Sequence, residues 1–138
     1  MKSTNYFNTL IQVADDCPAK IARVPSSENK SKTVAALQYE MIAQSPYKFT
    51  SDEIIFKVYA NRNEIEAMHF AEEKKMFFSK GQACLRTSPL AKRYGWGIHS
   101  NEEGKVALYA VVSVQYQKLV KDKSIAKTKA MRTKRVDK

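Results

Sequence analysis

The stretch YGWGIHSNEEGKVALYAVV, residues 94–112, decides the fold. Residues 94–99 alternate large and small side chains and residues 105–112 form a mostly apolar run, and both patterns predict strands. The Asn-Glu-Glu-Gly segment between them is typical of a hairpin turn, because Gly104 can adopt the positive φ that such a turn needs. We therefore expect an antiparallel hairpin in the second half of the chain.

Shorter strands are predicted outside this hairpin. Residues 6–13 alternate loosely between apolar and polar side chains, which is the period-two pattern of a half-buried strand. The Asp-Asp-Cys-Pro segment at residues 15–18 then indicates a turn, since Asp closes turns on nearby backbone and Pro cannot continue a ladder. We predict further short strands at residues 20–24 and 83–86.

Two helices are predicted in the first half of the chain. Apolar residues between Val34 and Ile42 recur with the 3.6-residue period of a helix. A second helix begins after Thr50, because Thr50 and Glu53 have the spacing of a capping box. Residues 54–60 are rich in β-formers, so a strand is the alternative there. The cap favours the helix, since propensity is the weaker guide.

Three further helices complete the prediction. One spans residues 64–79 and ends at Gly81, which suits a helix C-terminus. Ser88-Pro89 has the cap and first-turn chemistry of a short helix, and Ser113 caps the last one. This order predicts an α+β fold. We expect a small, mostly antiparallel sheet of three to five strands with helices packed on one face, as a single two-layer domain.

Charge divides the chain into two parts. Residues 1–117 carry 15 Lys and Arg against 12 Asp and Glu, whereas residues 118–138 carry nine against two, a net charge of +7. A chain of 138 residues is long enough to bury one core. We therefore expect one domain over residues 1–121 and a basic C-terminal tail over residues 122–138, helical in part or flexible.

Composition points to a soluble, cytoplasmic protein. The chain is 43% apolar and 28% charged, which is too apolar for a disordered protein. It has no run of 18 apolar residues, and its N-terminus lacks the apolar region of a signal peptide. Cys17 and Cys84 are too few and too far apart for a disulfide framework or a zinc site. We expect reduced thiols, no metal and no cofactor.

Several segments resemble one protein family. They are residues 47–60, 77–82 and 92–105, with the early Asn-Tyr-Phe and Asp-Cys-Pro segments at 5–7 and 16–18. Nearly the whole chain is similar to a family of small, uncharacterised, mainly bacterial proteins of about this length. The resemblance implies a free-standing cytoplasmic protein of unknown activity, and it implies no catalytic or binding residue.

The densest polar chemistry lies between Cys84 and His99. If residues 83–87 form a strand, Cys84 and Arg86 share one of its faces. The helix start at Ser88 would present free backbone N–H groups beside Arg86, an arrangement that favours phosphate or carboxylate. We therefore predict a non-catalytic module that binds an anionic ligand or partner. Its candidate residues are Arg86, Thr87, Ser88, Lys92, Arg93, Tyr94, Trp96 and His99.

The same residues have ordinary structural explanations. Ser-Pro is a common helix start, Lys92 and Arg93 can form a solvated face, and Trp96 suits core or edge packing. His99 can brace the adjacent turn. A catalytic alternative is an enzyme in which His99 activates the Cys84 thiol, because a thiolate needs a base or a cation nearby. Nothing in the spacing of the two residues requires this.

The basic tail suggests a different partner. Its Lys and Arg residues can attract phosphates in a sequence-independent, salt-sensitive way. The candidate nucleic-acid-binding residues are Lys127, Lys129, Arg132, Lys134 and Arg135. No aromatic residue follows Tyr116, so the tail offers no base stacking, and its apolar residues are too scattered for a membrane-surface helix. The alternative is a solvated terminus that keeps the protein soluble.

Overall fold

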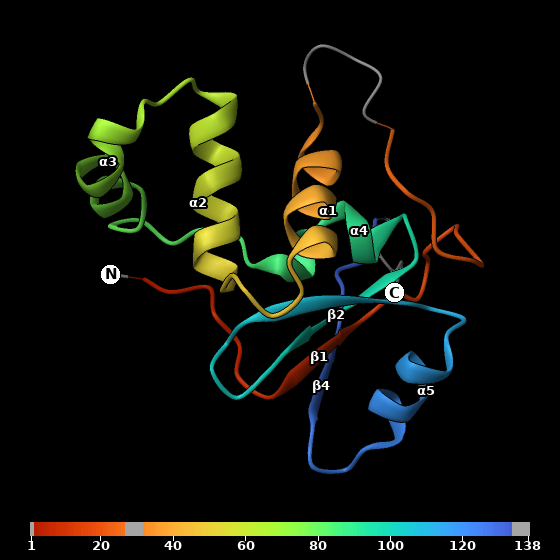
Figure 1. The fold of residues 1–138 in the computed structure, drawn as a ribbon. Coiled ribbons are helices and arrows are strands. Elements are labelled where there is room, and N and C mark those ends of the chain that lie inside the picture. Colours follow the sequence, from red (N-terminus) through yellow and green to blue (C-terminus); the bar gives the residue numbers. More distant parts are fainter. Residues whose placement is uncertain (1, 27–31, 134–138) are drawn as a thin grey trace, which may run out of the picture.

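The fold is organised around an open four-stranded sheet. The computed structural model describes residues 2–26 and 32–133 (Figure 1). The strands, in the order β3-β2-β1-β4, are Val106–Ala110, Trp96–Ser100, Thr9–Gln12 and Ala126–Lys129. β2 pairs antiparallel with both β1 and β3, whereas β1 and β4 are parallel. The predicted α+β class and the mostly antiparallel sheet are therefore confirmed.

The hairpin of β2 and β3 is closed by its own side chains. The Asn101 carboxamide oxygen accepts hydrogen bonds from the backbone N–H groups of Glu103 and Lys105, at 3.0 and 2.9 Å. Gly104 has a φ of 82°, a conformation that glycine adopts without strain. The turn predicted at residues 101–104 is therefore confirmed, and both strands are slightly shorter than predicted.

The helices begin at polar caps. They are α1 Val34–Gln44, α2 Ser51–Arg62, α3 Phe70–Phe77, α4 Pro89–Lys92 and α5 Val114–Lys121. Side-chain oxygens of Thr33, Thr50, Ser88 and Ser113 cap α1, α2, α4 and α5. The capping box of Thr50 and Glu53 is complete, and the β-forming residues behind it are helical. A local cap thus prevails over strand propensity, because the helix also buries Ile54 and Phe56.

Three segments differ from the prediction. The strand predicted at residues 20–24 is wrong: Arg23 donates one backbone bond to the Tyr94 carbonyl at 2.8 Å, but the segment forms no ladder. The helix predicted over residues 64–79 begins later than expected. Glu64 has a left-handed φ of 54°, which ends the helical course, and a 3₁₀ turn at Ala67–His69 precedes α3.

The strand predicted at residues 83–86 is also wrong. Leu85–Thr87 is a 3₁₀ turn, because the hydroxyl and the backbone N–H of Thr87 both donate to the Cys84 carbonyl, at 2.8 and 3.0 Å. Local side-chain bonding of this kind competes with sheet formation. Cys84 and Arg86 therefore do not share a strand face.

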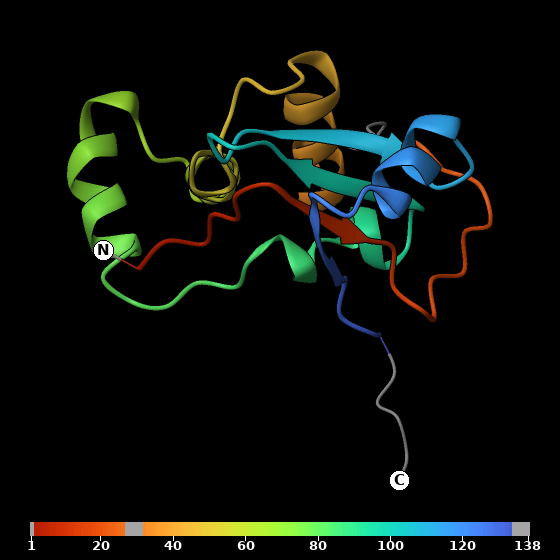
Figure 2. The ribbon, with the colours of Figure 1, turned by 90° about the horizontal axis from the view of Figure 1, so that it is seen from below.

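Different helices cover the two faces of the sheet. Ile11 and Ile98 point to one face and form the main core with residues of α1, α2 and α4. Leu10 points to the other face and packs against Tyr116 of α5. Figure 1 shows α5 on the opposite side of the sheet from α1, α2 and α4, and Figure 2 shows that side from below. α5 therefore adds a short layer to the face that the prediction left open.

Close packing of α5 depends on Gly97. A Cβ atom at Gly97 would lie only 2.4 Å from Cε2 of the Tyr116 ring. The ring is 5% exposed, and its hydroxyl accepts a hydrogen bond from the Val13 N–H at 3.2 Å. The absence of a side chain at Gly97 thus lets α5 lie directly on the strands.

Part of the segment predicted as a tail belongs to the sheet. β4 pairs with β1 along its whole length, and the flanking residues Ile125 and Ala130 are buried. The outer edge of β4 is partly closed by Arg86, whose Nε donates to the Lys129 carbonyl at 2.7 Å. Among the described residues, no helix is long and apolar enough to cross a membrane.

Candidate ligand-binding site

A cavity of about 260 Å³ opens between α1, α2 and the segment that follows α3. We call it the interhelical pocket. Its walls are mostly apolar, with Val34 from α1, Ile55 and Val58 from α2, and Leu85 from the 3₁₀ turn. The complete lining is Val34, Gln38, Ile55, Val58, Tyr59, Arg62, Asn63, Phe77, Ala83, Cys84, Leu85 and Thr87. An apolar cavity with a few polar groups is the usual form of a small-molecule site.

Arg62 supplies the positive charge of the interhelical pocket. It lies in the last turn of α2, where Ile55, Tyr59 and Arg62 occupy one helical face at i, i+4 and i+7. Within residues 2–26 and 32–133, no carboxylate forms an ion pair with Arg62. Its guanidinium is therefore available to a carboxylate or phosphate, which it can bind through two N–H groups.

Neighbouring polar side chains are held in place by other bonds. Asn63 lines the pocket, and its side-chain amide donates to the Tyr59 carbonyl at 2.8 Å. Gln38, 5% exposed, accepts a 2.5 Å hydrogen bond from the Ser88 hydroxyl. Because these contacts restrain the side chains, the pocket is largely preformed.

Cys84 lines the same pocket and contacts a tyrosine. Its Sγ lies 3.3 Å from the Tyr6 hydroxyl. Burial, followed by the contact with Cys84, raises the pKa of Tyr6, while Arg86 acts in the opposite direction. The thiol therefore faces a neutral hydroxyl rather than a base.

The structure separates the residues that the sequence grouped between Cys84 and His99. Ser88 is 2% exposed. Its hydroxyl donates a hydrogen bond to the Gln38 side chain and accepts one from the Leu90 N–H at 3.2 Å, so it is already used within the core. Arg86 bonds to the β4 edge, and Trp96 donates from Nε1 to the Arg23 carbonyl at 2.8 Å. Of the predicted ligand-binding residues, Thr87 alone lines the interhelical pocket, while Lys92, Arg93 and Tyr94 lie in α4 and the loop after it.

His99 points to the face of the sheet opposite Cys84 and forms a separate polar cluster. The Tyr47 hydroxyl lies 2.8 Å from His99 Nδ1 and 2.7 Å from the Tyr109 hydroxyl. Tyr47 has a φ of 58°, which is uncommon for a residue with a side chain. Sequence reasoning selected His99 but missed both tyrosines, because Tyr47 joins the cluster from a segment 52 residues before His99.

Burial of the His99 ring favours its neutral form. Nε2 is buried, and no hydrogen-bond partner for it exists among the residues that the structure describes. Burial lowers the pKa of His99, and the charge of Asp122 opposes the shift. Burial also raises the pKa of Tyr47, as does its bond to Tyr109. The described part of the chain contains no group of three or more His, Cys, Asp or Glu that could hold a metal.

Three of the predicted nucleic-acid-binding residues, Lys127, Lys129 and Arg132, lie within the described part of the chain. Lys127 and Lys129 lie on β4, and the Lys127 ammonium donates to the Asp122 carbonyl. Asp15 pairs with Lys129 at 2.7 Å and with Arg132 at 3.2 Å. These two cations lower the pKa of Asp15 by donating hydrogen bonds to its carboxylate oxygens. Lys134 and Arg135 lie outside the described residues.

The fold and the pocket define a small α+β protein with an open, mixed four-stranded sheet. The chain belongs to a family of unknown function (DUF6157), whose model matches residues 1–136. No curated protein and no solved structure matches it. The predicted family resemblance is confirmed, while the bacterial distribution and the cytoplasmic location remain predictions.

Proposed function

We propose that this protein is a non-catalytic module that binds a small anionic ligand in the interhelical pocket. The observation that carries the proposal is Arg62, a cation without an ion-pair partner in the described chain, in the lining of a mostly apolar cavity of about 260 Å³. Apolar walls favour a hydrocarbon or aromatic body, and the guanidinium favours a carboxylate or phosphate group. The restrained side chains of Gln38 and Asn63 supply polar contacts that would orient the ligand.

Phenyl phosphate is a suitable probe, because it joins an aromatic ring to a dianion. We expect titration of the ¹⁵N-labelled protein to shift backbone resonances of α1, α2 and residues 83–87. Arg62→Gln should weaken the binding about tenfold or more, as expected for loss of a charge-assisted bidentate contact. Arg93→Gln is the matched control, since Arg93 is exposed and lies outside the pocket.

The outcomes separate this site from the one predicted from sequence. Resonance shifts centred on Arg86 and Arg93, with Arg62→Gln unchanged, would contradict the interhelical pocket and favour the sequence-based site. Release of inorganic phosphate during the titration would contradict the non-catalytic assignment. Neutral benzyl alcohol should bind more weakly than phenyl phosphate, because it cannot engage the guanidinium.

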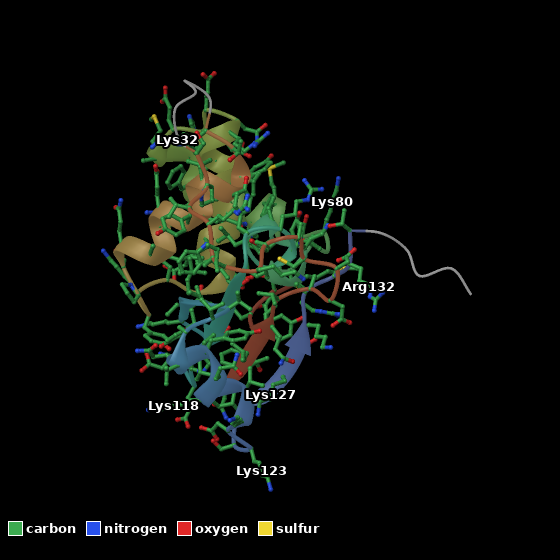
Figure 3. All side chains as sticks on the ribbon, turned by 90° about the vertical axis from the view of Figure 1, so that its right-hand side faces the viewer. Lys32, Lys80, Lys118, Lys123, Lys127 and Arg132 are labelled. Atoms are coloured by element: carbon green, nitrogen blue, oxygen red, sulfur yellow. The ribbon has the colours of Figure 1, made fainter. Side chains whose placement is uncertain are left out.

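A second candidate function is binding of nucleic acid to the surface formed by α5 and β4. This basic surface carries Lys118, Lys121, Lys123, Lys127, Lys129 and Arg132 (Figure 3 labels four of them). Lys127 and Lys129 are register partners of Leu10 and Gln12, so both point to the face covered by α5. Two residues apart on a strand, they lie roughly 6.6 Å apart along the chain.

Existing ion pairs do not block this surface. The pairs of Asp15 with Lys129 and Arg132 are exposed to solvent, which screens them, so phosphates can replace the carboxylate. Fluorescence anisotropy with a 20-nucleotide single strand, at several salt concentrations, tests the candidate. Replacing Lys127 and Lys129 with Gln should reduce the slope of log K against log salt by roughly 1.4. Replacing Lys74 and Lys75 of α3 with Gln is the control. If the two double substitutions reduce the slope equally, binding is not confined to the surface of α5 and β4.

A further inference from the structure

A second cavity lies directly beside the interhelical pocket. It has a volume of about 480 Å³ and is lined by Tyr59, Glu73, Met76, Phe77, Ser79, Lys80 and Gln82. Tyr59 and Phe77 line both cavities. Their ring centroids are 4.5 Å apart, with an angle of 34° between the ring planes. The two cavities therefore meet at one pair of aromatic rings.

This ring pair is anchored from behind. Phe77 makes edge contacts with Phe56 and Phe78, at centroid distances of 5.9 and 4.9 Å. Phe56 and Phe78 are 3% and 0% exposed and belong to the small core between α2 and α3. Tyr59 and Phe77 themselves are only partly buried. A rigid aromatic surface is thus accessible from both cavities, and aromatic rings of a ligand stack favourably on such surfaces.

The two cavities differ in charge. The interhelical pocket has the single cation Arg62, whereas the second cavity has one acid, Glu73, and one base, Lys80. Glu73 precedes Phe77 by four residues on α3, so both lie on the same helical face. None of the ion pairs in the described part of the chain includes Arg62, Glu73 or Lys80. An end group that carries both an ammonium and an anion complements the second cavity.

We propose that the two cavities form one elongated site, an inference that rests on the proposed function of the interhelical pocket. The site takes a molecule with three parts in a row. An anionic group binds Arg62, an aromatic or other flat apolar body lies against Tyr59 and Phe77, and a zwitterionic end of the amino-acid type binds between Glu73 and Lys80. The ligand class is therefore an amino acid whose aromatic side chain ends in phosphate or carboxylate.

Three probes separate the contributions of these parts. Phenyl phosphate has the anion and the ring, and O-phosphotyrosine adds the zwitterionic end. N-acetyl-O-phosphotyrosine amide keeps the length but has a neutral end. Measured by titration of the ¹⁵N-labelled full chain, O-phosphotyrosine should bind about tenfold tighter than its acetyl amide, because charge-assisted bonds are the strong ones. Glu73→Gln and Lys80→Gln should each remove most of that ratio and leave the affinity for phenyl phosphate unchanged.

The controls distinguish failure of this inference from failure of the proposed function. Lys74→Gln, on α3 but outside both cavities, should preserve the tenfold ratio. If phenyl phosphate binds through Arg62 while O-phosphotyrosine and its amide bind equally, the elongated site is refuted and the proposed function stands. If none of the three probes binds, both fail. Dispersed amide spectra of each variant establish that the substituted chains are folded.

Discussion

Adding one methyl group at Gly97 should loosen α5 from the sheet. The new Cβ would lie 2.4 and 2.7 Å from two carbons of the Tyr116 ring, whereas carbon atoms pack at about 3.5–4.0 Å. The ring must therefore move by about 1 Å. That movement stretches the 3.2 Å bond from the Val13 N–H to the tyrosine hydroxyl beyond a useful length. Overpacking and the unpaired N–H together should lower the free energy of unfolding by about 2–4 kcal/mol.

Urea unfolding followed by circular dichroism measures this loss. Gly81→Ala is the matched control, because a Cβ there meets only the Lys2 side chain, at 3.9 Å, and should change stability by less than about 0.5 kcal/mol. A Tyr116→Ala variant creates space, so Gly97→Ala should cost much less in that background than in the parent. Equal costs in the two backgrounds, or a stable Gly97→Ala single variant, would refute the packing argument.

Three other outcomes follow from buried polar contacts. Asp52→Ala should lower the free energy of unfolding by roughly 2–4 kcal/mol in urea titration, because it leaves the N–H of buried Thr4 without its acceptor and removes one of the two partners of the Thr4 hydroxyl; both contacts with the carboxylate are 2.7 Å. Thr50→Ala should cost about 1 kcal/mol through loss of the α2 cap, while Thr50→Ser should retain most of it. Stability should fall as the pH drops below about 6.5, since the unfolded chain protonates His99 before the folded chain, whose His99 pKa is lowered. The stabilisation is fully present above the pKa of His99 in the unfolded chain and is lost as the pH falls below it. The urea midpoints at pH 7.5 and 5.5 should therefore differ less in His99→Gln than in the parent. If the difference between the two midpoints is the same in both proteins, His99 does not cause the pH dependence.

Local signals in the sequence predicted much of the fold. The turn of the hairpin at residues 94–112 and the caps of α1 and α2 depend on side chains that bond to residues a few positions away. All the residues that form these structures are therefore visible in a short stretch of sequence. β4 is different, because its Ala-Lys-Thr-Lys sequence has no apolar alternation. It is an edge strand that is held by backbone pairing and by the buried flanking residues Ile125 and Ala130.

The candidate site was less accessible to sequence reasoning. Ile55, Tyr59 and Arg62 form a recognisable helical stripe, and attention to its charged end could have selected Arg62. That the stripe faces residues 83–87 is a tertiary contact that no local pattern reports. The separation of Ser88 from His99 is likewise a tertiary feature, since Ser88 is buried in the core beside Gln38 and His99 points to the other side of the sheet.

The parallel pairing of β1 with β4 has a consequence for synthesis of the protein. Thr9 pairs with Ala126, so β1 receives one of its two neighbours only after every other described strand and helix has been synthesised. Until then the edge of β1 has unpaired N–H and C=O groups, the kind of edge on which chains aggregate. Contacts so distant in sequence also slow folding. A chain that stops before Ala126 would carry this exposed edge permanently, which makes β4 the last of the four described strands to join the sheet during synthesis.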